Sequence, residues 1–341
     1  MMQPSVSEDD TIENVPEETT SSPSSYYTTF WLLYAISICA FLGASTRASL
    51  AYYLQCDNSP AVSHQQSTAC VTSSQSALFV DLPANLFGSF LMGVLLHQNH
   101  DTVPYCQAWQ VGFCGSLTTF SSWNMQMVTM LEEGDIAMAI VGYILGTFGA
   151  YGSFVLGTAL STLVRLSDGS NEQNDDHSST HRNSSDTNAS RKQTTFPREI
   201  WLIPPTLLAC GLLLFSLTFT TTNSAAFITT LAPLAWTAPG GALTRYFLSI
   251  HYNTAETPMR GTLIANWTAC MLLAVITGLE IQSIDMSPWT TGFLGSLSTV
   301  STWIKEIHCH DPPSNWLYAV ISLGGAMLLS LAIYVPMHRF F

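Results

Sequence analysis

The sequence predicts an all-α polytopic membrane protein, built from two inverted four-helix repeats that are joined by a linking transmembrane helix. Composition is the first observation behind this prediction. Of the 341 residues, 47% are apolar and only 10% are charged, whereas soluble domains average about 25% charged residues. The second observation is a segment that occurs twice, as Gly112 to Trp123 and again, slightly altered, as Gly292 to Trp303. Such a repeat indicates that one structural unit is duplicated in the chain.

Apolar runs near the length of about 20 residues that a bilayer requires divide the chain into spans. Nine are predicted, at 29–54, 77–97, 105–131, 136–164, 200–221, 225–250, 260–280, 288–308 and 314–338. Residues 1–28 are rich in Ser, Thr, Pro and Glu, which predicts a disordered acidic tail. Residues 165–199 are polar and predict a disordered linker. The first repeat is then 29–164, the linking helix 200–221, and the second repeat 225–341.

Matching segments align the two repeats. Gly43 to Arg47 (GASTR) in the first span corresponds to Gly241 to Arg245 (GALTR) in the sixth, and Asn85 in the second span corresponds to Asn266 in the seventh. The single linking helix makes the second unit enter the membrane from the opposite face, so the repeats are expected to be inverted. Inverted repeats in transport proteins place the functional site near the midplane, at the repeat interface.

Basic residues set the predicted orientation. The positive-inside rule places the linker in the cytosol, because five basic residues lie there or at its edge: Arg165, Arg182, Arg191, Lys192 and Arg198. Counting spans then puts the N-terminus in the cytosol and the C-terminus outside, and we expect a multi-pass protein of the plasma membrane. The net charge of −13 comes largely from the tail and the linker, and without a basic patch no nucleic-acid partner is expected. Cys56 and Cys70 share an external loop in which a disulfide can form.

The duplicated segment interrupts an apolar span with glycines and hydroxyl groups. Bare backbone at membrane depth is tolerated only against protein or a polar pathway, and paired interruptions in two halves indicate an ion or substrate site. A break at Gly115 frees backbone carbonyls, which suit a hard cation such as sodium. The hydroxyl groups either bond to their own helix backbone or line a polar track; they belong to Ser116, Thr118, Thr119, Ser121 and Ser122. Thr147, Ser153 and Ser322 on the fourth and ninth spans would extend such a track.

Two pairs of polar residues in the apolar spans have alternative interpretations. Asn85 and Asn266 are amides that need partners when buried, and they either join helices or donate to an anion. Arg47 and Arg245 are cations at the membrane edge. They either serve the functional site or are structural, and in the second case they extend their charged ends to the membrane interface or bond backbone carbonyls.

The aromatic residues of the duplicated segment are also open to two interpretations. Phe120 and Trp123 are three residues apart, so they share one helix face. Trp303 repeats the second of these positions, whereas the first is occupied in the second copy by Val300. Rings in such positions are usually core or lipid-facing, but the positive edge of a ring can also face an anion.

These residues together resemble the CrcB/Fluc family of small fluoride channels and, within it, the fused two-repeat fluoride export (FEX) proteins of eukaryotes. The family motif is approximately G-F-x-G-G-x-T-T-F-S-T-F, which Gly112 to Trp123 matches closely and Gly292 to Trp303 matches more loosely. The resemblance covers both repeats. It implies a monomer that acts as a fused pseudo-dimer with two antiparallel pores, and whose partners are the fluoride ion and the lipid bilayer, with no obligate protein partner.

The resemblance also implies roles for individual residues. A central structural sodium ion would be held by the backbone carbonyls of Gly115, Thr118, Gly295 and Ser298. The family pairs the first ring of one unit with the second ring of the other, so Phe120 shares one pore with Trp303, and Val300 shares the other with Trp123. Because Val300 has no ring, we expect its pore to be degenerate. Arg47 and Arg245 are assigned structural roles, and the conducting pore is assigned Phe120, Trp303, Asn85, Asn266, Thr119, Ser121, Thr299 and Ser301.

The function expected from this resemblance is a fluoride-selective channel that exports cytosolic fluoride passively and gives fluoride resistance. No GxxxxGK[ST] motif for ATP is present in the sequence, which agrees with passive transport. The alternative is a proton-coupled secondary transporter of fluoride or another small anion, which would more often carry an intramembrane carboxylate. The candidates lie near span ends, at Glu132, Glu133, Glu280, Asp285 and Glu306. A hydrolase would need Ser116 beside a histidine at similar depth, and His308 and His338 lie near span ends, so no enzyme is expected.

Overall fold

The computed structural model describes residues 23–56, 71–96, 104–175, 225–254, 257, 259–279 and 288–340. Nearly all of these residues are helical, and the β-pairing among them is limited to an isolated bridge between Gln55 and Thr72. The predicted all-α class is therefore confirmed. The predicted linking helix, 200–221, lies outside the described residues, as does most of the predicted tail and linker.

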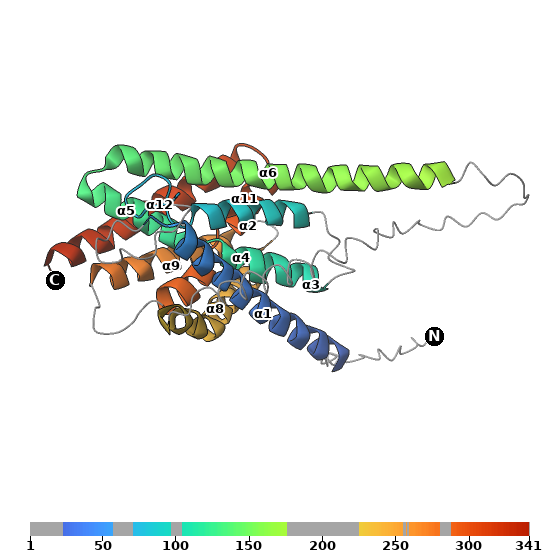
Figure 1. Cartoon of the computed structure of the whole chain (residues 1–341), viewed down its shortest axis with the longest axis horizontal. Coiled ribbons are helices and arrows are strands. Elements are labelled where there is room, and N and C mark those ends of the chain that lie inside the picture. Colours follow the sequence, from blue (N-terminus) through green and yellow to red (C-terminus); the bar gives the residue numbers. More distant parts are fainter. Residues whose placement is uncertain are drawn as a thin grey trace, which may run out of the picture.

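The described helices follow the same order in both units. The first unit contains α1 (Pro23–Leu54), α2 (Leu82–Leu95), α3 (Pro104–Gln107), the π-helix η1 (Ala108–Cys114), α4 (Gly115–Leu117), α5 (Ser121–Glu133) and α6 (Ile136–Asp175). The second contains α8 (Ala225–Tyr252), α9 (Arg260–Gly278), the π-helix η4 (Pro288–Leu294), α10 (Gly295–Leu297), α11 (Ser301–Cys309) and α12 (Ser314–Phe340). In Figure 1, α6 runs from the left end of the molecule to the right, whereas α12 finishes at the left end.

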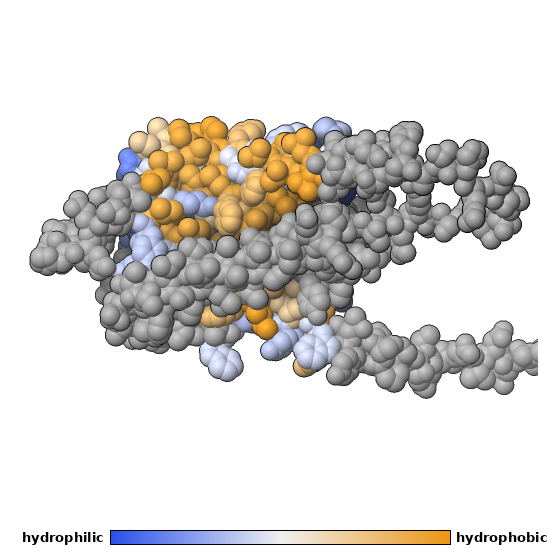
Figure 2. Space-filling model, turned by 45° about the vertical axis from the view of Figure 1, so that its right-hand side comes forward, coloured by the Kyte–Doolittle hydropathy of each residue, from blue (hydrophilic) through white to orange (hydrophobic). Residues whose placement is uncertain are grey.

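Four of the described helices are long and apolar enough to cross a membrane. They are Thr29–Leu54 within α1, Ile136–Arg165 within α6, α9 and α12, and α2 is a shorter apolar helix. The outward faces of α6 and α12 expose large apolar side chains such as Ile144, Phe148 and Leu328. Figure 2 shows apolar residues gathered over much of one described face. An outer surface of this kind suits lipid as its solvent.

Three helix boundaries differ from the sequence prediction. α1 begins at Pro23, so residues 23–28, which were predicted as tail, are helical; proline is well suited to the first helical position. α6 continues to Asp175, so residues 165–175, which were predicted as linker, are helical too. Extending an existing helix gains one hydrogen bond for each residue fixed, and no proline interrupts that stretch. α2 begins at Leu82 rather than at 77, with a proline in its first turn.

The two units interlock through their interrupted third segments. α5 of the first unit packs against α9 and α12 of the second, and α11 of the second packs against α2 and α6 of the first. α1 and α8 also pack against each other and against η1 and η4. A Cβ atom on Gly43 would collide with the carbonyl oxygen of Phe113, and one on Gly241 with that of Phe293. Glycine therefore permits this close helix approach.

A disulfide begins at the end of the segment that follows α1. Cys56 takes part in a disulfide, which agrees with the expected bond in this loop. The predicted partner, Cys70, lies outside the described residues. The other cysteines that the structure describes are free: Cys39, Cys106, Cys114, Cys270 and Cys309.

Candidate functional site

Both duplicated segments are broken at the same place. α4 ends before Thr118, which is extended with φ −95° and ψ 145°. α10 ends before Ser298, which is extended with φ −85° and ψ 154°. The two breaks touch each other, because the hydroxyl oxygens of Thr118 and Thr299 lie 3.1 Å apart. The interruptions of the two spans thus meet at the interface between the units.

Each broken helix is capped by a side chain of the other unit. Ser298 Oγ accepts hydrogen bonds from the backbone N–H groups of Phe120 at 3.2 Å and Ser121 at 3.1 Å, where α5 begins. Thr118 Oγ1 accepts from those of Val300 at 3.3 Å and Ser301 at 3.1 Å, where α11 begins. The first N–H groups of a helix have no intrahelical partner, and a hydroxyl cap satisfies them. These caps were not predicted from the sequence, which indicated neither that the Thr118 hydroxyl bonds the other unit nor that the Ser298 hydroxyl does.

The other hydroxyls assigned to the pore gather around these caps. Thr119 Oγ1 is 3.1 Å and Ser121 Oγ 2.9 Å from Ser298 Oγ. Ser301 Oγ lies 3.0 Å from Thr118 Oγ1 and donates to a backbone carbonyl. All of these side chains are fully buried, as is Thr299. The hydroxyls therefore bond mainly to one another and to backbone, across the interface between the units.

Arg47 and Arg245 each reach across to the broken helix of the other unit. Arg47 donates through Nη1 to the carbonyl of Gly295 at 2.8 Å and through Nη2 to that of Thr291. Arg245 donates through Nη1 to the carbonyl of Gly115 at 2.8 Å and through Nη2 to that of Val111 at 2.6 Å. Both guanidinium groups are almost completely buried. Of the two interpretations, the structure places these arginines on backbone carbonyls.

Asn85 and Asn266 hold the extended residues of the breaks in the same way. Asn85 donates from Nδ2 to the carbonyl of Thr119 at 3.1 Å and accepts its N–H at 2.9 Å. Asn266 makes the equivalent pair with Thr299, at 3.1 and 2.8 Å. Each amide thereby replaces bonds that the helix loses at its break. One Nδ2 hydrogen of each asparagine remains for another acceptor.

Three of the four carbonyls assigned to sodium, those of Gly115, Gly295 and Ser298, lie at this junction, and neutral oxygens of this kind are ligands that hard cations accept. Arg245 Nη1 contacts the carbonyls of both Gly115 and Ser298, at 2.8 and 3.4 Å, and Arg47 Nη1 contacts that of Gly295. A carbonyl oxygen carries two lone pairs, so one donor leaves one site open. An ion here would share the carbonyls with two guanidinium groups.

The aromatic residues of the two breaks form one buried cluster. Phe120 meets Trp303 edge to face, with ring centroids 5.3 Å apart. Trp123 stacks on Phe79 at 5.6 Å, and its Nε1 donates to the carbonyl of Gly142 at 3.3 Å. Trp303 Nε1, in contrast, is buried without a hydrogen-bond partner among the described residues. Val300, at the fourth ring position assigned to the pores, is buried and offers no ring.

The two helices that complete the units differ in their buried faces. α12 carries a polar line in which every fourth residue is buried: Tyr318, Ser322, Ala326, Ser330 and Tyr334. In α6, the buried residues that correspond to the first four members of this line are Gly142, Gly146, Ala150 and Phe154. The ring of Trp123 occupies the space that a Cβ on Gly146 would need. α12 thus carries hydroxyl groups at positions where α6 has Gly142, Gly146 and Phe154.

Glu306 is a further polar residue beside the site, and from the sequence it was predicted only as a carboxylate near a span end. It lies on α11, three residues after Trp303, and accepts hydrogen bonds from Thr262 Oγ1 and from the Tyr318 hydroxyl at 2.7 Å. Its carboxylate thus joins α9 and α12 beside the polar line of α12. The sequence could have indicated this position, because Glu306 follows Trp303 by only three residues.

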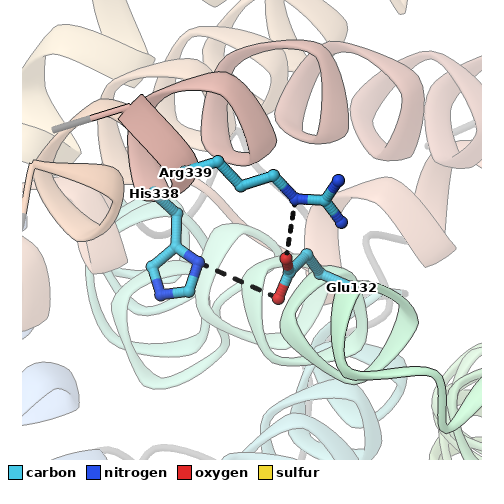
Figure 3. A network of polar contacts seen from close by, with 3 residues as sticks. All are labelled: Glu132, His338 and Arg339. Carbon is cyan, nitrogen blue, oxygen red and sulfur yellow. Dashed lines mark hydrogen bonds and ion pairs between the residues drawn. The ribbon is translucent and has the colours of Figure 1, made fainter.

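Glu132, His338 and Arg339 gather where α5 and α12 end, as Figure 3 shows. Glu132 Oε1 accepts from Arg339 Nε at 3.3 Å, and its Oε2 lies 3.9 Å from His338 Nδ1. The Glu132 side chain is 14% exposed, whereas that of Arg339 is 63% exposed. This cluster closes the seam between α5 and α12 at its outer end.

Comparisons with known proteins agree with this architecture. A family model described as CrcB-like protein, Camphor Resistance (CrcB), matches residues 34–161 and 232–336. The Fluoride-specific ion channel FluC of Marinobacter nauticus is 30% identical over 140 residues, which cover 40% of this chain and 98% of the relative. FluC 1 of Staphylococcus aureus is 40% identical over 98 residues, which cover 26% of this chain and 80% of the relative. No solved structure matches the chain.

The relatives are therefore each about as long as one unit, whereas this chain contains two. The family model matches both units, and each match includes a helix break with its asparagine and arginine contacts. The matched ranges make up more than half of the chain. The protein belongs to the CrcB-like family.

Proposed function

We propose that this protein is a fluoride-selective ion channel that exports cytosolic fluoride passively and so gives fluoride resistance. The observation that carries the proposal is the pair of broken helices, capped by each other, at the interface of two units that match a family whose curated relatives are named fluoride-specific ion channels. Broken helices facing each other inside a membrane are typical of ion sites. The relatives are named as channels and not as enzymes.

The proposed topology has nine spans and inverted repeats, with the N-terminus in the cytosol and the C-terminus outside the plasma membrane. Support comes from the opposite directions of α6 and α12 (Figure 1) and from the reciprocal contacts of Arg47 and Arg245. Because each unit caps the helix of the other, one chain already supplies both halves of the interface. We therefore propose a monomer that acts as a fused pseudo-dimer.

Passive export follows from the charge of the ion. A negative-inside potential drives an anion outward with about 2.3 kcal/mol per 100 mV. Fluoride is strongly hydrated, so the pathway must replace water with N–H and O–H donors and ring edges at short range. A buried donor without a partner among the described residues meets this need, and Trp303 Nε1 is such a group.

We assign conduction to the pore that contains Phe120 and Trp303, bounded by α5, α9, α11 and α12. The polar line of α12 supports this assignment, and Asn266 on α9 belongs to the same side. The pore that contains Val300 and Trp123 is proposed to be degenerate. Its support is the tight packing of Trp123 against Gly142 and Gly146, which leaves the α6 side without a polar line.

A structural sodium ion at the carbonyls of Gly115, Thr118, Gly295 and Ser298 is part of the proposal. It would add a positive charge that steadies the extended residues of the breaks and would not itself move. The support is the convergence of these neutral oxygens at the interface between the units. Arg47 and Arg245 would share these carbonyl oxygens with the ion.

A second candidate function is favoured by one observation. Glu306 is a carboxylate inside the helical bundle, bonded by Thr262 and Tyr318, and ionisable groups within membranes often carry protons. A proton-coupled transporter of fluoride or another small anion would use such a group. Its transport would depend on a proton gradient, whereas a channel needs only the membrane potential.

The test is fluoride efflux from liposomes that contain the purified full chain, with a potassium diffusion potential set by valinomycin. A channel gives fast, voltage-driven fluoride loss without chloride loss and without a pH gradient. Glu306→Gln keeps voltage-driven flux in a channel but abolishes proton-coupled flux in a transporter. Folded protein that moves no fluoride under either driving force would refute fluoride transport by either mechanism.

A further inference from the structure

We propose that residues 72–81, which precede α2, form a plug that closes the outer end of the pore of Val300 and Trp123. This inference rests on the proposed channel with two pores, and it gives the degenerate pore a second closure besides its missing ring. In the proposed topology, the outer end is the side on which α1 finishes and α2 begins. The plug meets the protein there through one aromatic ring and one anchoring glutamine side chain.

Both ends of the plug are attached to helices. The backbone N–H groups of Val71 and Thr72 both donate to the carbonyl of Leu54 at the end of α1, each at 3.0 Å. The carbonyl of Thr72 accepts from the N–H of Cys56 at 2.7 Å, and the Thr72 side chain is buried. At its other end the plug continues directly into α2 at Leu82. A segment that is attached at both ends is held in one place, as a plug requires.

Phe79 is the residue that the plug inserts into the protein. Its side chain is fully buried, although the neighbouring Leu78 is 42% exposed. The ring of Phe79 stacks on that of Trp123, with the centroids 5.6 Å apart and the planes inclined by 19°. Burying so large an apolar side chain stabilises the plug in this position. Because Trp123 is one of the two residues assigned to the degenerate pore, the plug contacts the remaining ring of that pore.

The backbone of the plug also fills space beside α6. Ala77 is buried, and its Cα lies 3.6 Å from the position that a Cβ on Gly142 would take. The thioether of Met127 lies against the same position. Gly142 corresponds to Tyr318 on α12. The plug therefore occupies room on the α6 side where the other unit has a tyrosine side chain.

Gln126 fastens the plug to α5. Its Nε2 donates to the carbonyls of Ser73 at 2.8 Å and Ser76 at 3.4 Å. Its Oε1 accepts from the backbone N–H of Val80 at 3.2 Å. One side chain thus satisfies three backbone groups of a segment that lies outside the helices. These bonds hold the plug on both sides of its inserted ring.

The described residues of the other unit contain no such plug. Glu306 stands where Gln126 stands, three positions after the tryptophan, but it bonds the side chains of Thr262 and Tyr318. The connection between α8 and α9 is limited to 253–259 and contains no aromatic residue. The plug is thus found beside the pore that lacks a ring. A pore without that ring has lost part of its selectivity, and closing it prevents a leak of other ions.

Access of a small oxidant to Met127, which lies beside the plug, tests the closure. Hydrogen peroxide transfers one oxygen atom to the methionine sulfur and leaves water, and mass spectrometry of the full chain in liposomes locates the sulfoxide. We expect Phe79→Ala and Gln126→Ala each to speed the oxidation of Met127 about tenfold or more, because oxidation follows exposure. Phe79→Leu fills most of the space and should keep Met127 protected.

Two controls separate an opened plug from a general loss of stability. Gln110→Ala removes another glutamine that joins helices, since Gln110 bonds the carbonyl of Leu95 and the ammonium of Lys305, and it should leave Met127 protected. Met92, which is 1% exposed, reports on the fold within each variant. The proposal is wrong if neither Phe79→Ala nor Gln126→Ala speeds the oxidation of Met127 while Met92 stays protected.

Fluoride flux tests the consequence for conduction. In a Phe120→Ala chain, whose conducting pore is silenced, Val300→Phe restores the missing ring of the other pore. We expect flux to stay at or below about a tenth of the wild-type value, because the plug still closes that pore. Flux that returns with Val300→Phe alone would show an open outer end and refute the plug. A folded wild-type chain without flux would remove the channel function instead, and the oxidation of Met127 would still decide whether residues 72–81 seal the protein.

Discussion

Ser298 Oγ accepts a hydrogen bond from the backbone N–H of Ser121 at 3.1 Å, so a side chain of the second unit caps the helix that carries Phe120 in the first. Thr118 does the same for the helix that begins at Ser301. A helix cap is usually local in sequence, but here 177 residues separate the two partners. The rings of the candidate pore are thus positioned by contacts between the two units.

Ser298→Ala should destabilise the protein through this cap. Loss of an N-cap costs about 0.5–2 kcal/mol, and buried N–H groups left without partners cost about 1–3 kcal/mol. We expect a lower melting temperature of the purified protein in detergent, together with reduced fluoride flux. Ser298→Thr keeps the hydroxyl and is the control. Equal melting temperatures for Ser298→Ala and the wild type would show that the cap is not needed.

Arg47→Lys should be strongly destabilising although it keeps the charge. The guanidinium of Arg47 bonds carbonyls of both units, at Ser116 and Gly295. A lysine ammonium lacks the planar fork that reaches several acceptors at once, and a broken buried polar network costs about 3–5 kcal/mol. Thermal unfolding measures the effect. Arg339→Lys, at a position that is 63% exposed, should leave stability nearly unchanged.

Phe120→Ala and Val300→Ala should separate the two pores. We expect Phe120→Ala to reduce fluoride flux at least tenfold, because it removes the ring that meets Trp303 at 5.3 Å, and loss of that contact corresponds to at least about 1.4 kcal/mol. Val300→Ala should conduct like the wild type. Liposome efflux measures both, and the opposite ranking would reverse the assignment of conducting and degenerate pores.

Glu132→Gln should change conduction in a salt-dependent manner. Glu132 places a carboxylate at the end of the α5–α12 seam, beside His338 and Arg339. Removing this negative charge makes the mouth more attractive to anions, so flux should rise about two- to tenfold at low ionic strength. The gain should shrink at 1 M salt, where the Debye length is about 3 Å. Glu133→Gln, on an exposed neighbouring residue, is the control, and an equal gain in both variants would exclude a specific role.

Replacing sodium by a large organic cation should lower stability and flux if an ion binds the carbonyls of Gly115 and Ser298. At a sodium concentration one hundred times the dissociation constant, the expected stabilisation is about 2.7 kcal/mol. The melting temperature as a function of sodium concentration measures it, with potassium at equal ionic strength as the control. A melting temperature that does not depend on the cation would show that the two arginines stabilise the junction alone.

Much of the architecture was determined by the sequence. The deficit of charge and the long apolar runs required helices in lipid, and the duplicated glycine and hydroxyl segment located both helix breaks within a few residues. The correspondences of Asn85 with Asn266 and of Arg47 with Arg245 also identified residues that hold those breaks. Apolar runs, helix breaks and corresponding residues can be predicted from the sequence, because they depend on the composition and spacing of residues within one segment.

Only the tertiary structure decided which groups meet across the two units. It gave Arg47 the carbonyls of the opposite break, gave Ser298 the start of α5, and joined Asn124 to Ser330. It also separated the polar line of α12 from the α6 side filled by Trp123. The physical reason is that hydropathy and spacing report the face that a helix buries, whereas hydrogen-bond partners depend on how two helices distant in sequence are packed together.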